Sequence, residues 1–323
     1  LKATTALQSA VTAANSTLSE STDAAKSALN KVPTNVQDDA DVQKQEVALN
    51  DVLSNPDSSK EEIDKAKSAL DTAVTGAQSK LADAKDQAKQ EVKTANDNKA
   101  WQDNAAVANA TDALQNLIDS KTATKTDIDN AIASLKSAEQ AADNKLADVT
   151  ATAKSALGKT APVSGEKTVV DAAKDLQTLL DSGTATATQI ADATKKLTDT
   201  VSAETTTRGK AVNDAASDVV PANVQDVKTV QDLQDKLQDA LANAAADKGT
   251  TQAIKDAQQA LDDAVKQAQS DLADVKNTAM SDMTNVPVNL LDDKSVTDAK
   301  AALNDAINSA TATATDVKAA QQA

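Results

Sequence analysis

The apolar positions of this chain recur in one fixed pattern. An apolar residue is followed six positions later by Val, seven later again by Leu, then by Asn or Gln, and three positions further by Leu or Ile. The five copies are Val36, Val42, Leu49, Asn50 and Leu53; Trp101, Val107, Leu114, Gln115 and Ile118; Val163, Val169, Leu176, Gln177 and Leu180; Val224, Val230, Leu237, Gln238 and Leu241; and Leu290, Val296, Leu303, Asn304 and Ile307. The Val, the Leu and the final apolar residue share one face at 3.6 residues per turn. The pattern therefore predicts five amphipathic helices.

The spacing of the copies predicts a tandem repeat. Their valines, Val42, Val107, Val169, Val230 and Val296, stand 65, 62, 61 and 66 residues apart. This period is longer than that of common two-helix repeats and leaves room for three short helices. We therefore expect each repeat to hold three helices, of which the one described above is the middle one.

A second apolar pair predicts the third helix of each repeat. Ile is followed seven residues later by Leu at Ile63 and Leu70, Ile128 and Leu135, Ile190 and Leu197, and Ile254 and Leu261. In most copies another Leu comes eleven residues later, and between Thr250 and Val286 there is neither Gly nor Pro. The third helix is therefore expected to continue into the first helix of the next repeat, as one helix of ~30 residues and ~45 Å.

Residues that favour helix starts precede both kinds of helix. Four positions before each middle-helix Val we predict the N-caps Asp38, Asp103, Gly165, Asp226 and Asp292. Before the third helices we predict hydroxyl caps at Ser59, Thr124, Thr186, Thr250 and Thr313, of which all but Thr250 have an acid or Gln three positions later, as in a capping box. All five prolines fall in predicted loops, where proline ends the preceding helix.

These elements predict an all-α fold of tandem three-helix bundles, joined by long shared helices into an elongated rod. The predicted segments are the end of a preceding repeat (1–17), repeat 1 (18–80), repeat 2 (81–145), repeat 3 (146–210), repeat 4 (211–271) and repeat 5 (272–323, with its third helix truncated). Leu7, Val11, Ala14 and Leu18 match the end of a repeat at Leu70, Val74, Ala77 and Leu81. We therefore expect the chain to be a fragment of a longer array.

Composition changes this picture in two ways. The chain has no Phe, Tyr, Cys or His and one Trp, so each core must be built from Leu, Val, Ile and Ala, and neither disulfides nor His/Cys metal sites can support it. Small units of this kind are expected to depend on their neighbours. The formal net charge of −16 argues against nucleic acid as a partner, because binding to phosphates requires clustered Lys and Arg.

Two places depart from the regular repeat. Trp101 occupies the position of Val36, Val163, Val224 and Leu290, so we expect it to fill a core position under the turn before the middle helix, rather than to act as a binding anchor. Arg208 stands where the shared helix should carry Leu, and Gly209 follows it. Because Gly costs helix stability, we expect this shared helix to be the weakest and the place where the array bends.

The sequence contains no catalytic, cofactor-binding or metal-binding constellation. The acidic pairs Asp38-Asp39, Asp262-Asp263 and Asp292-Asp293 could be carboxylate dyads or calcium ligands, but they lack EF-hand spacing, so solvated or capping roles are favoured. Ser-His and Cys-His nucleophiles are excluded because His and Cys are missing. No apolar stretch reaches the ~20 residues that span a bilayer, and helices that lie on membranes usually carry Lys and Arg on the polar face, whereas these are acidic.

The segment from Val42 to Gln78 resembles a known group of repeats. Leu49–Leu53, Asn55-Pro56 and Glu61–Ala66 followed by Leu70 are similar to the FIVAR-type and related three-helix repeats of large Gram-positive cell-wall proteins. Through the internal repeat the resemblance extends over essentially the whole chain. It implies an extracellular location on a bacterial surface, with cell-wall attachment through parts outside these residues, and an elongated stalk that projects an adhesive domain.

Two functions follow from these expectations. The first is a structural stalk or spacer without enzymatic activity. The alternative is a binding module, an adhesin whose repeats dock host matrix proteins, serum proteins or cell-wall polymers. The sequence identifies neither a ligand nor the source organism, the other domains of the parent protein or side-by-side association of arrays.

Overall fold

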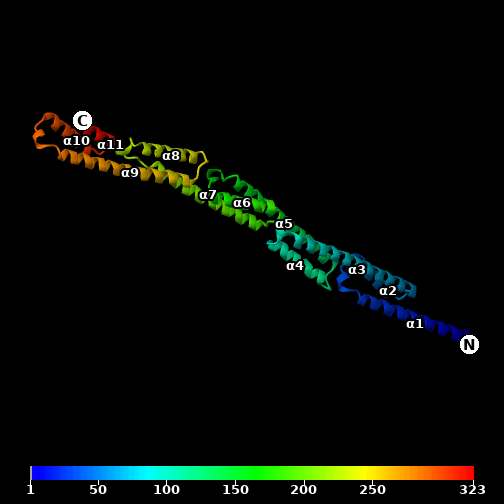
Figure 1. The fold of residues 1–323 in the computed structure, drawn as a ribbon. Coiled ribbons are helices and arrows are strands. Elements are labelled where there is room, and N and C mark those ends of the chain that lie inside the picture. The colour runs from blue at the N-terminus through cyan, green and yellow to red at the C-terminus, as the bar shows by residue number, and fades with distance from the viewer. Residues whose placement is uncertain (1) are drawn as a thin grey trace. The chain divides into compact units, whose positions relative to one another are not determined.

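The computed structural model describes residues 2–323, and every regular element in this range is helical. The predicted all-α fold is confirmed. The α-helices and short 3₁₀ turns follow in the order α1 (Lys2–Asn30), η1 (Thr34–Val36), α2 (Ala40–Ser54), α3 (Lys60–Asp97), η2 (Lys99–Trp101), α4 (Ala105–Asp119), α5 (Lys125–Leu157), η3 (Ala161–Val163), α6 (Lys167–Ser182), α7 (Ala187–Ala216), η4 (Ala222–Val224), α8 (Lys228–Ala245), α9 (Thr251–Thr284), η5 (Val288–Leu290), α10 (Lys294–Asn308) and α11 (Ala314–Gln322) (Figure 1).

The long helices are the predicted shared helices. α3, α5, α7 and α9 contain 38, 33, 30 and 34 residues, and each combines the third helix of one repeat with the first helix of the next. The middle helices are α2, α4, α6, α8 and α10. α3 runs without a break through Gly76, and α7 runs through Arg208 and Gly209, so the irregular sequence at 208–209 does not interrupt the helix.

The predicted starts of the third helices are confirmed. Ser59 and Thr313 form complete capping boxes with Glu62 and Asp316. Thr124 pairs in the same way with Asp127, and Thr186 with Gln189. In the remaining copy the Thr250 hydroxyl accepts a hydrogen bond from the backbone N–H of Ala253. These local pairs fix where each third helix begins.

The predicted starts of the middle helices are wrong by one residue. The N-caps of α2, α4 and α10 are Asp39, Asn104 and Asp293, not Asp38, Asp103 and Asp292. α8 begins after Val227, without a side-chain cap, and α6 begins at Lys167, two residues after Gly165. The reason is that a capping side chain bonds to the second and third backbone N–H groups of its helix, so its position is fixed by where those groups lie. Asp39 accepts hydrogen bonds from the second and third backbone N–H groups of α2, at 2.9 and 3.3 Å, which places the cap three residues before Val42.

The turns between first and middle helices contain short 3₁₀ segments, which the sequence pattern represented only as loops. Pro33, Pro221 and Pro287 directly precede η1, η4 and η5, and Pro162 lies inside η3. In the copy without proline, the Asn98 side chain accepts a hydrogen bond from the Ala100 backbone N–H and starts η2 in its place. All five prolines lie outside the α-helices, as predicted.

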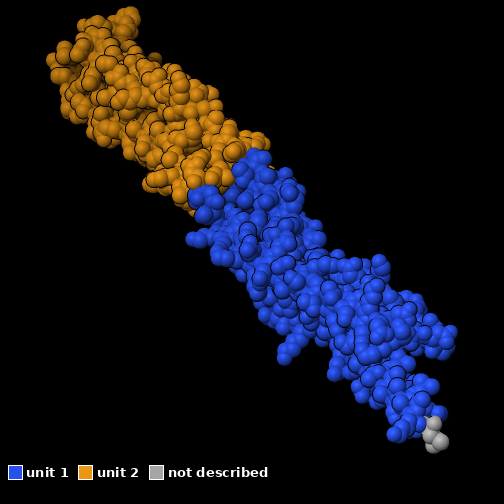
Figure 2. All heavy atoms as spheres, turned by 90° about the vertical axis from the view of Figure 1, so that its right-hand side faces the viewer, with its two compact units in different colours: residues 1–151, 182–190 blue, residues 152–181, 191–323 orange. Residues whose placement is uncertain are grey.

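The chain divides into two compact units, residues 1–151 with 182–190 and residues 152–181 with 191–323 (Figure 2). In the first unit α3 packs against α1, α2 and α4, around a core that includes Leu49, Leu70, Leu114 and Leu135. In the second, α9 packs with α8 in a core around Leu237 and Leu261, and with α10 and α11 around Leu303. The division into six segments remains a prediction, and the predicted repeat 3 (146–210) contributes residues to both units.

Candidate functional site at the repeat junctions

The turn between the first and middle helix of one repeat meets the start of the third helix of the next repeat, and we call this place a junction. At the first junction the side chains of Thr126 and Thr124 lie beside the Asp38 carboxylate and lower its pKa. At the second, the Thr186 hydroxyl donates to Asp103 Oδ2 at 2.6 Å. Thr124 and Thr186 are the N-caps of their own helices. The two aspartates predicted as caps of their own middle helices therefore bind the cap of a neighbouring repeat instead.

These carboxylates bind as anions. Partial burial alone would raise the pKa of Asp38, but the hydrogen bonds from Thr126 and Thr124 outweigh it, and the pKa lies below its ordinary value of 3.8. Burial likewise opposes ionisation of Asp103, while Thr186 and Thr188 lower its pKa below 3.8. A hydroxyl bond to an ionised acceptor is stronger than a neutral one. The position beside a helix N-terminus favours the negative charge further.

A glutamate makes the third junction. Gly165 takes the position of Asp38 and lies against the next repeat, where a methyl group added to it would come within 3.5 Å of the Gly249 carbonyl oxygen. Glu166 then reaches across, and its Oε1 accepts a hydrogen bond from the Thr251 backbone N–H at 2.6 Å. Asp226 holds the corresponding position in repeat 4 and is exposed. Three junctions are thus bridged by a carboxylate.

The repeated apolar position next to these acids is fully buried in three of the repeats. Val36, Val163 and Val224 are 0 to 1% exposed. Trp101 is half-buried and packs against the core of its unit, as its alignment with these valines predicts. Its indole Nε1 donates to Asp143 Oδ1 of α5 at 2.8 Å. The larger side chain therefore fills the same position and adds one polar contact.

Arg208 is a junction residue that the sequence pattern marked only as a defect. Its side chain is 6% exposed. The guanidinium donates one hydrogen bond to the Pro162 carbonyl oxygen in η3 and another, at 3.1 Å, to the Ala244 carbonyl oxygen in the last turn of α8. The C-terminal carbonyls of a helix are free acceptors with partial negative charge. One side chain thus joins the turn of repeat 3 to the middle helix of repeat 4.

Two lysines hold the ends of middle helices in a related way. Lys85 Nζ of α3 donates to the carbonyl oxygens of Ile118 and Ser120 at 2.8 and 2.7 Å. Lys276 Nζ of α9 donates to the Ser309 carbonyl oxygen at 3.0 Å. Both lysines occupy the same repeat position, one helical turn after the position of Arg208. A cation on this face of the first helix is the sequence signal that would have identified these contacts.

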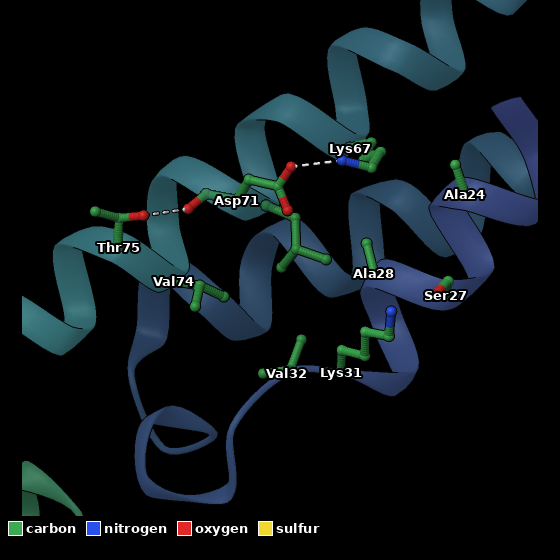
Figure 3. Close-up of a pocket in the computed structure, with 10 residues that line it drawn as sticks. Ala24, Ser27, Ala28, Lys31, Val32, Lys67, Asp71, Val74 and Thr75 are labelled. Atoms are coloured by element: carbon green, nitrogen blue, oxygen red, sulfur yellow. Dashed lines mark hydrogen bonds and ion pairs between the residues drawn. The ribbon is translucent and has the colours of Figure 1, made fainter.

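A shallow groove of ≈ 440 Å³ lies between α1 and α3 (Figure 3). Val32, Leu70 and Val74 form its apolar part, and Lys31 stands at its rim. Lys67 and Asp71 pair across one turn of α3 at 2.7 Å. Exposed i, i+4 pairs of this kind contribute little to stability. The groove is therefore an apolar surface with ordinary solvated charges around it.

Glu139 of α5 has a partly buried carboxyl group. Its Oε1 is buried without a hydrogen-bond partner in the described part of the chain. Burial and the nearby Glu91 charge raise its pKa above 4.5, and Lys136 only partly offsets them. Lys136 instead pairs with Glu91 at 2.9 Å. Within residues 2–323 no group of three or more acidic side chains could hold a metal ion.

The acidic pairs singled out in the sequence have separate roles. Asp39 and Asp293 cap their own helices, and Asp38 binds the neighbouring repeat. Asp262 lies next to Asp218 of the preceding turn, and burial together with that second carboxyl group raises its pKa above 3.8. None of the helices over residues 2–323 combines the length and apolar character needed to cross a bilayer.

Comparison with known proteins adds no assignment. No protein-family profile, no curated protein and no solved structure matches this chain.

Proposed function

We propose that this chain is a spacer in a bacterial cell-surface protein, where it projects an adhesive domain from the cell wall and catalyses no reaction. The surface location rests on the resemblance of residues 42–78 to Gram-positive cell-wall repeats. The observation that carries the spacer role is the repetition of one junction, built from a continuous helix and a carboxylate bound to the next repeat.

A spacer must resist rotation at each joint between its units. A single continuous helix can bend and twist as a flexible rod. A second contact away from the helix axis restricts both motions, and the bonds made by Asp38, Asp103 and Glu166 supply such contacts. Stiffness would then arise from the paired connections rather than from large cores, which small aromatic-free units cannot build.

Small-angle X-ray scattering tests this proposal. At roughly 40 Å per repeat, estimated from the helix rise, five repeats in line give a maximum dimension on the order of 150 to 200 Å. A compact, globular particle would contradict the spacer role. Antibodies raised against the chain should label intact cells of the source organism, and labelling only after lysis would contradict the surface location.

The groove between α1 and α3 favours a second candidate, an adhesin module that binds a host matrix or serum protein or a cell-wall polymer. Pull-down from serum, matrix and wall fractions separates the two functions. Saturable binding that is lost when Ala24→Trp fills the groove would favour the adhesin. Binding that persists in this variant, or no saturable binding, would leave the spacer alone.

A further inference from the structure

The groove between α1 and α3 has a counterpart in the second compact unit. Between the end of α5 and α7, a space of ≈ 320 Å³ is lined by residues that hold the same repeat positions. The matching residues include Ala28 and Ala156, Lys31 and Lys159, and Val74 and Val201. The second groove lies within the predicted repeat 3, away from both ends of the sequence, so the two grooves belong to the repeat itself. We call them the odd-repeat grooves.

In repeats 2 and 4 a carboxylate of the chain itself takes the place of these two alanines. Glu91 holds this position in repeat 2, where its side chain is 22% exposed and its Oε1 lies 2.9 Å from Lys136 Nζ of α5. Asp218 holds it in repeat 4, and its Oδ2 accepts a hydrogen bond of 3.5 Å from Gln258 of α9. In both repeats the carboxylate reaches a polar group of the third helix. This place in the repeat therefore accommodates a carboxylate.

The odd-repeat grooves lack this carboxylate but have a lysine beside them. Lys31 and Lys159 stand three residues after the two alanines, at exposed positions that line the grooves (Figure 3). Neither ammonium group pairs with a carboxylate within residues 2–323. Repeat 2, which supplies its own carboxylate, has Thr94 at this position. In a chain of net charge −16, each odd-repeat groove therefore combines an apolar space with an unpaired cation.

We propose that the two odd-repeat grooves bind the carboxylate side chains of an acidic peptide segment in a partner protein. A glutamate of that segment would lie where Glu91 lies in repeat 2, with its aliphatic part in the groove and its carboxylate beside Lys31 or Lys159. Two chains of net charge −16 repel each other, whereas a short acidic segment brings few charges, so a partner is favoured over a second copy. The inference rests on the adhesin role, the second candidate above, and the spacer role does not depend on it.

Titration of the full chain with a labelled peptide tests the proposal. The probe is a helical Ala-based peptide with Leu and Glu one turn apart, and its counterpart carries Gln in place of Glu. Fluorescence anisotropy should show saturable binding of the Glu peptide, and isothermal titration calorimetry should show two sites per chain. The Gln peptide should bind at least about tenfold more weakly, because it cannot form a charge-assisted bond to lysine. Equal affinity of the two peptides, or no saturable binding of the Glu peptide, overturns the proposal.

Filling the grooves gives the sharpest result. Ala28→Glu should place the chain's own carboxylate in the first groove, as Glu91 does in repeat 2, and should reduce the stoichiometry to one peptide per chain. Ala28→Glu together with Ala156→Glu should abolish binding. Both alanines are half-buried at a position where other repeats carry an acid, and circular dichroism checks that the variants fold. Unchanged binding by the doubly substituted chain would overturn the proposal.

The lysines provide a matched pair of variants. Lys31→Glu with Lys159→Glu should weaken binding of the Glu peptide at least about tenfold, because the charge beside each groove becomes repulsive. Lys26→Glu with Lys154→Glu makes the same charge change five residues earlier, at exposed positions outside the grooves, and should leave the affinity unchanged. Equal weakening in the two double variants would show a general charge effect and contradict the proposal.

Three further results would replace the acidic peptide by another occupant and overturn the proposal. Poly(glycerol phosphate) that displaces the Glu peptide at a lower concentration would identify phosphate as the ligand. Self-association of the chain that is lost in the Lys31→Glu, Lys159→Glu variant would identify a second copy. A matrix or serum protein whose binding Ala24→Trp abolishes, but which the Glu peptide does not displace, would leave the adhesin role intact without this chemistry. The spacer role is tested separately, by the maximum dimension from scattering.

Discussion

At the scale of single residues, Arg208 shows how a position that breaks the repeat pattern can join two repeats. Leu81 and Leu272 hold the same repeat position and are buried in their cores. Arg208 is equally buried, but it extends to two backbone carbonyl groups in different repeats. Burying a charge is costly unless hydrogen bonds replace its water, and these carbonyls provide that replacement. The aliphatic part of the side chain can still pack as leucine does.

Substitutions of Arg208 should separate the contribution of its packing to stability from the contribution of its hydrogen bonds. Arg208→Ala removes both and should lower the free energy of unfolding by about 2 to 4 kcal/mol. Arg208→Leu restores the apolar side chain that the other repeats carry. It should lower the free energy of unfolding by less than half as much as Arg208→Ala, because replacing a buried charge by a well-packed apolar residue is often close to neutral. Urea unfolding followed by circular dichroism measures both. Equal losses in the two variants would contradict the packing argument.

The Asp218–Asp262 pair predicts a residue whose removal stabilises the protein. Burial and the neighbouring carboxyl group raise the folded-state pKa of Asp262, while Lys266 acts in the opposite direction. A raised pKa contributes stability that is fully present below pH 3.8 and is lost as pH rises through the folded value. At pH 7, Asp262→Asn should therefore raise the free energy of unfolding, by up to about 1 kcal/mol for a partly exposed pair.

Two features of the Asp262→Asn experiment make it specific. The gain should shrink as pH falls toward 3.8, because the Asp262 carboxyl group of the unchanged protein is then protonated and, like the amide of the variant, carries no charge. Asp263→Asn removes one negative charge as well, but at the next residue, where the side chain contacts Lys266 and Gln259. This variant should not stabilise the protein. A gain of the same size in both variants would indicate a general charge effect.

At the scale of helices and turns, the sequence predicted contacts that lie within a few residues of each other. The capping boxes at Ser59 and Thr313 were identified because both partners stand three residues apart. Asp38 and Asp39 could each cap α2, and local spacing does not separate them. Only the position of Thr126, in the next repeat, decides that Asp38 faces the junction.

The sequence also contains a longer-range signal for the junctions. Thr126, Thr188 and Thr315 share one repeat position, and the preceding repeats carry Asp38, Asp103 and Asp226 at the matching turn. Where the turn instead carries Gly165, the following repeat has Gln252. Matching residue types across a fixed spacing suggest contact even within one sequence. Arg208 has no counterpart in the other repeats, so its two partners could not have been inferred in this way.

The junction at Asp103 makes a prediction about a helix start. Asp103→Ala should cost about 1 kcal/mol and should speed amide hydrogen exchange in the first turn of α7, because Thr186 loses its acceptor. The folded-state pKa of Asp103 is lowered, so its contribution is present above pH 3.8 and is lost as pH falls through the folded value. Asp112→Ala, on an exposed face of α4, is the matched control. Equal exchange in α7 for both variants would contradict the role of the junction.

At the scale of the whole molecule, the junctions of Asp38, Asp103 and Glu166 should make the predicted repeats 1 to 4 depend on one another for their stability. The cores contain mainly Leu, Val, Ile and Ala, and small units bury a low fraction of their surface. In such arrays stability approximates the sum of the intrinsic stability of each repeat and the contributions of its interfaces. A repeat in the middle has a shared helix on both sides, so the interfaces should account for much of its stability.

An excised repeat should therefore melt well below the same repeat in the array. For domains of this size 1 kcal/mol corresponds to about 4 to 8 °C, so losing two interfaces of about 2 kcal/mol each should lower Tm by at least about 15 °C. Circular dichroism of residues 81–145, of residues 81–210 and of the full chain measures the series, and the two-repeat fragment should fall between the other two. The melting curves of these fragments also test the predicted repeat boundaries. A fragment that is cut inside a true folding unit would not unfold cooperatively at any temperature. If residues 81–145 melt cooperatively at the temperature of the full chain, the repeats are independent domains and the junctions contribute nothing to their stability.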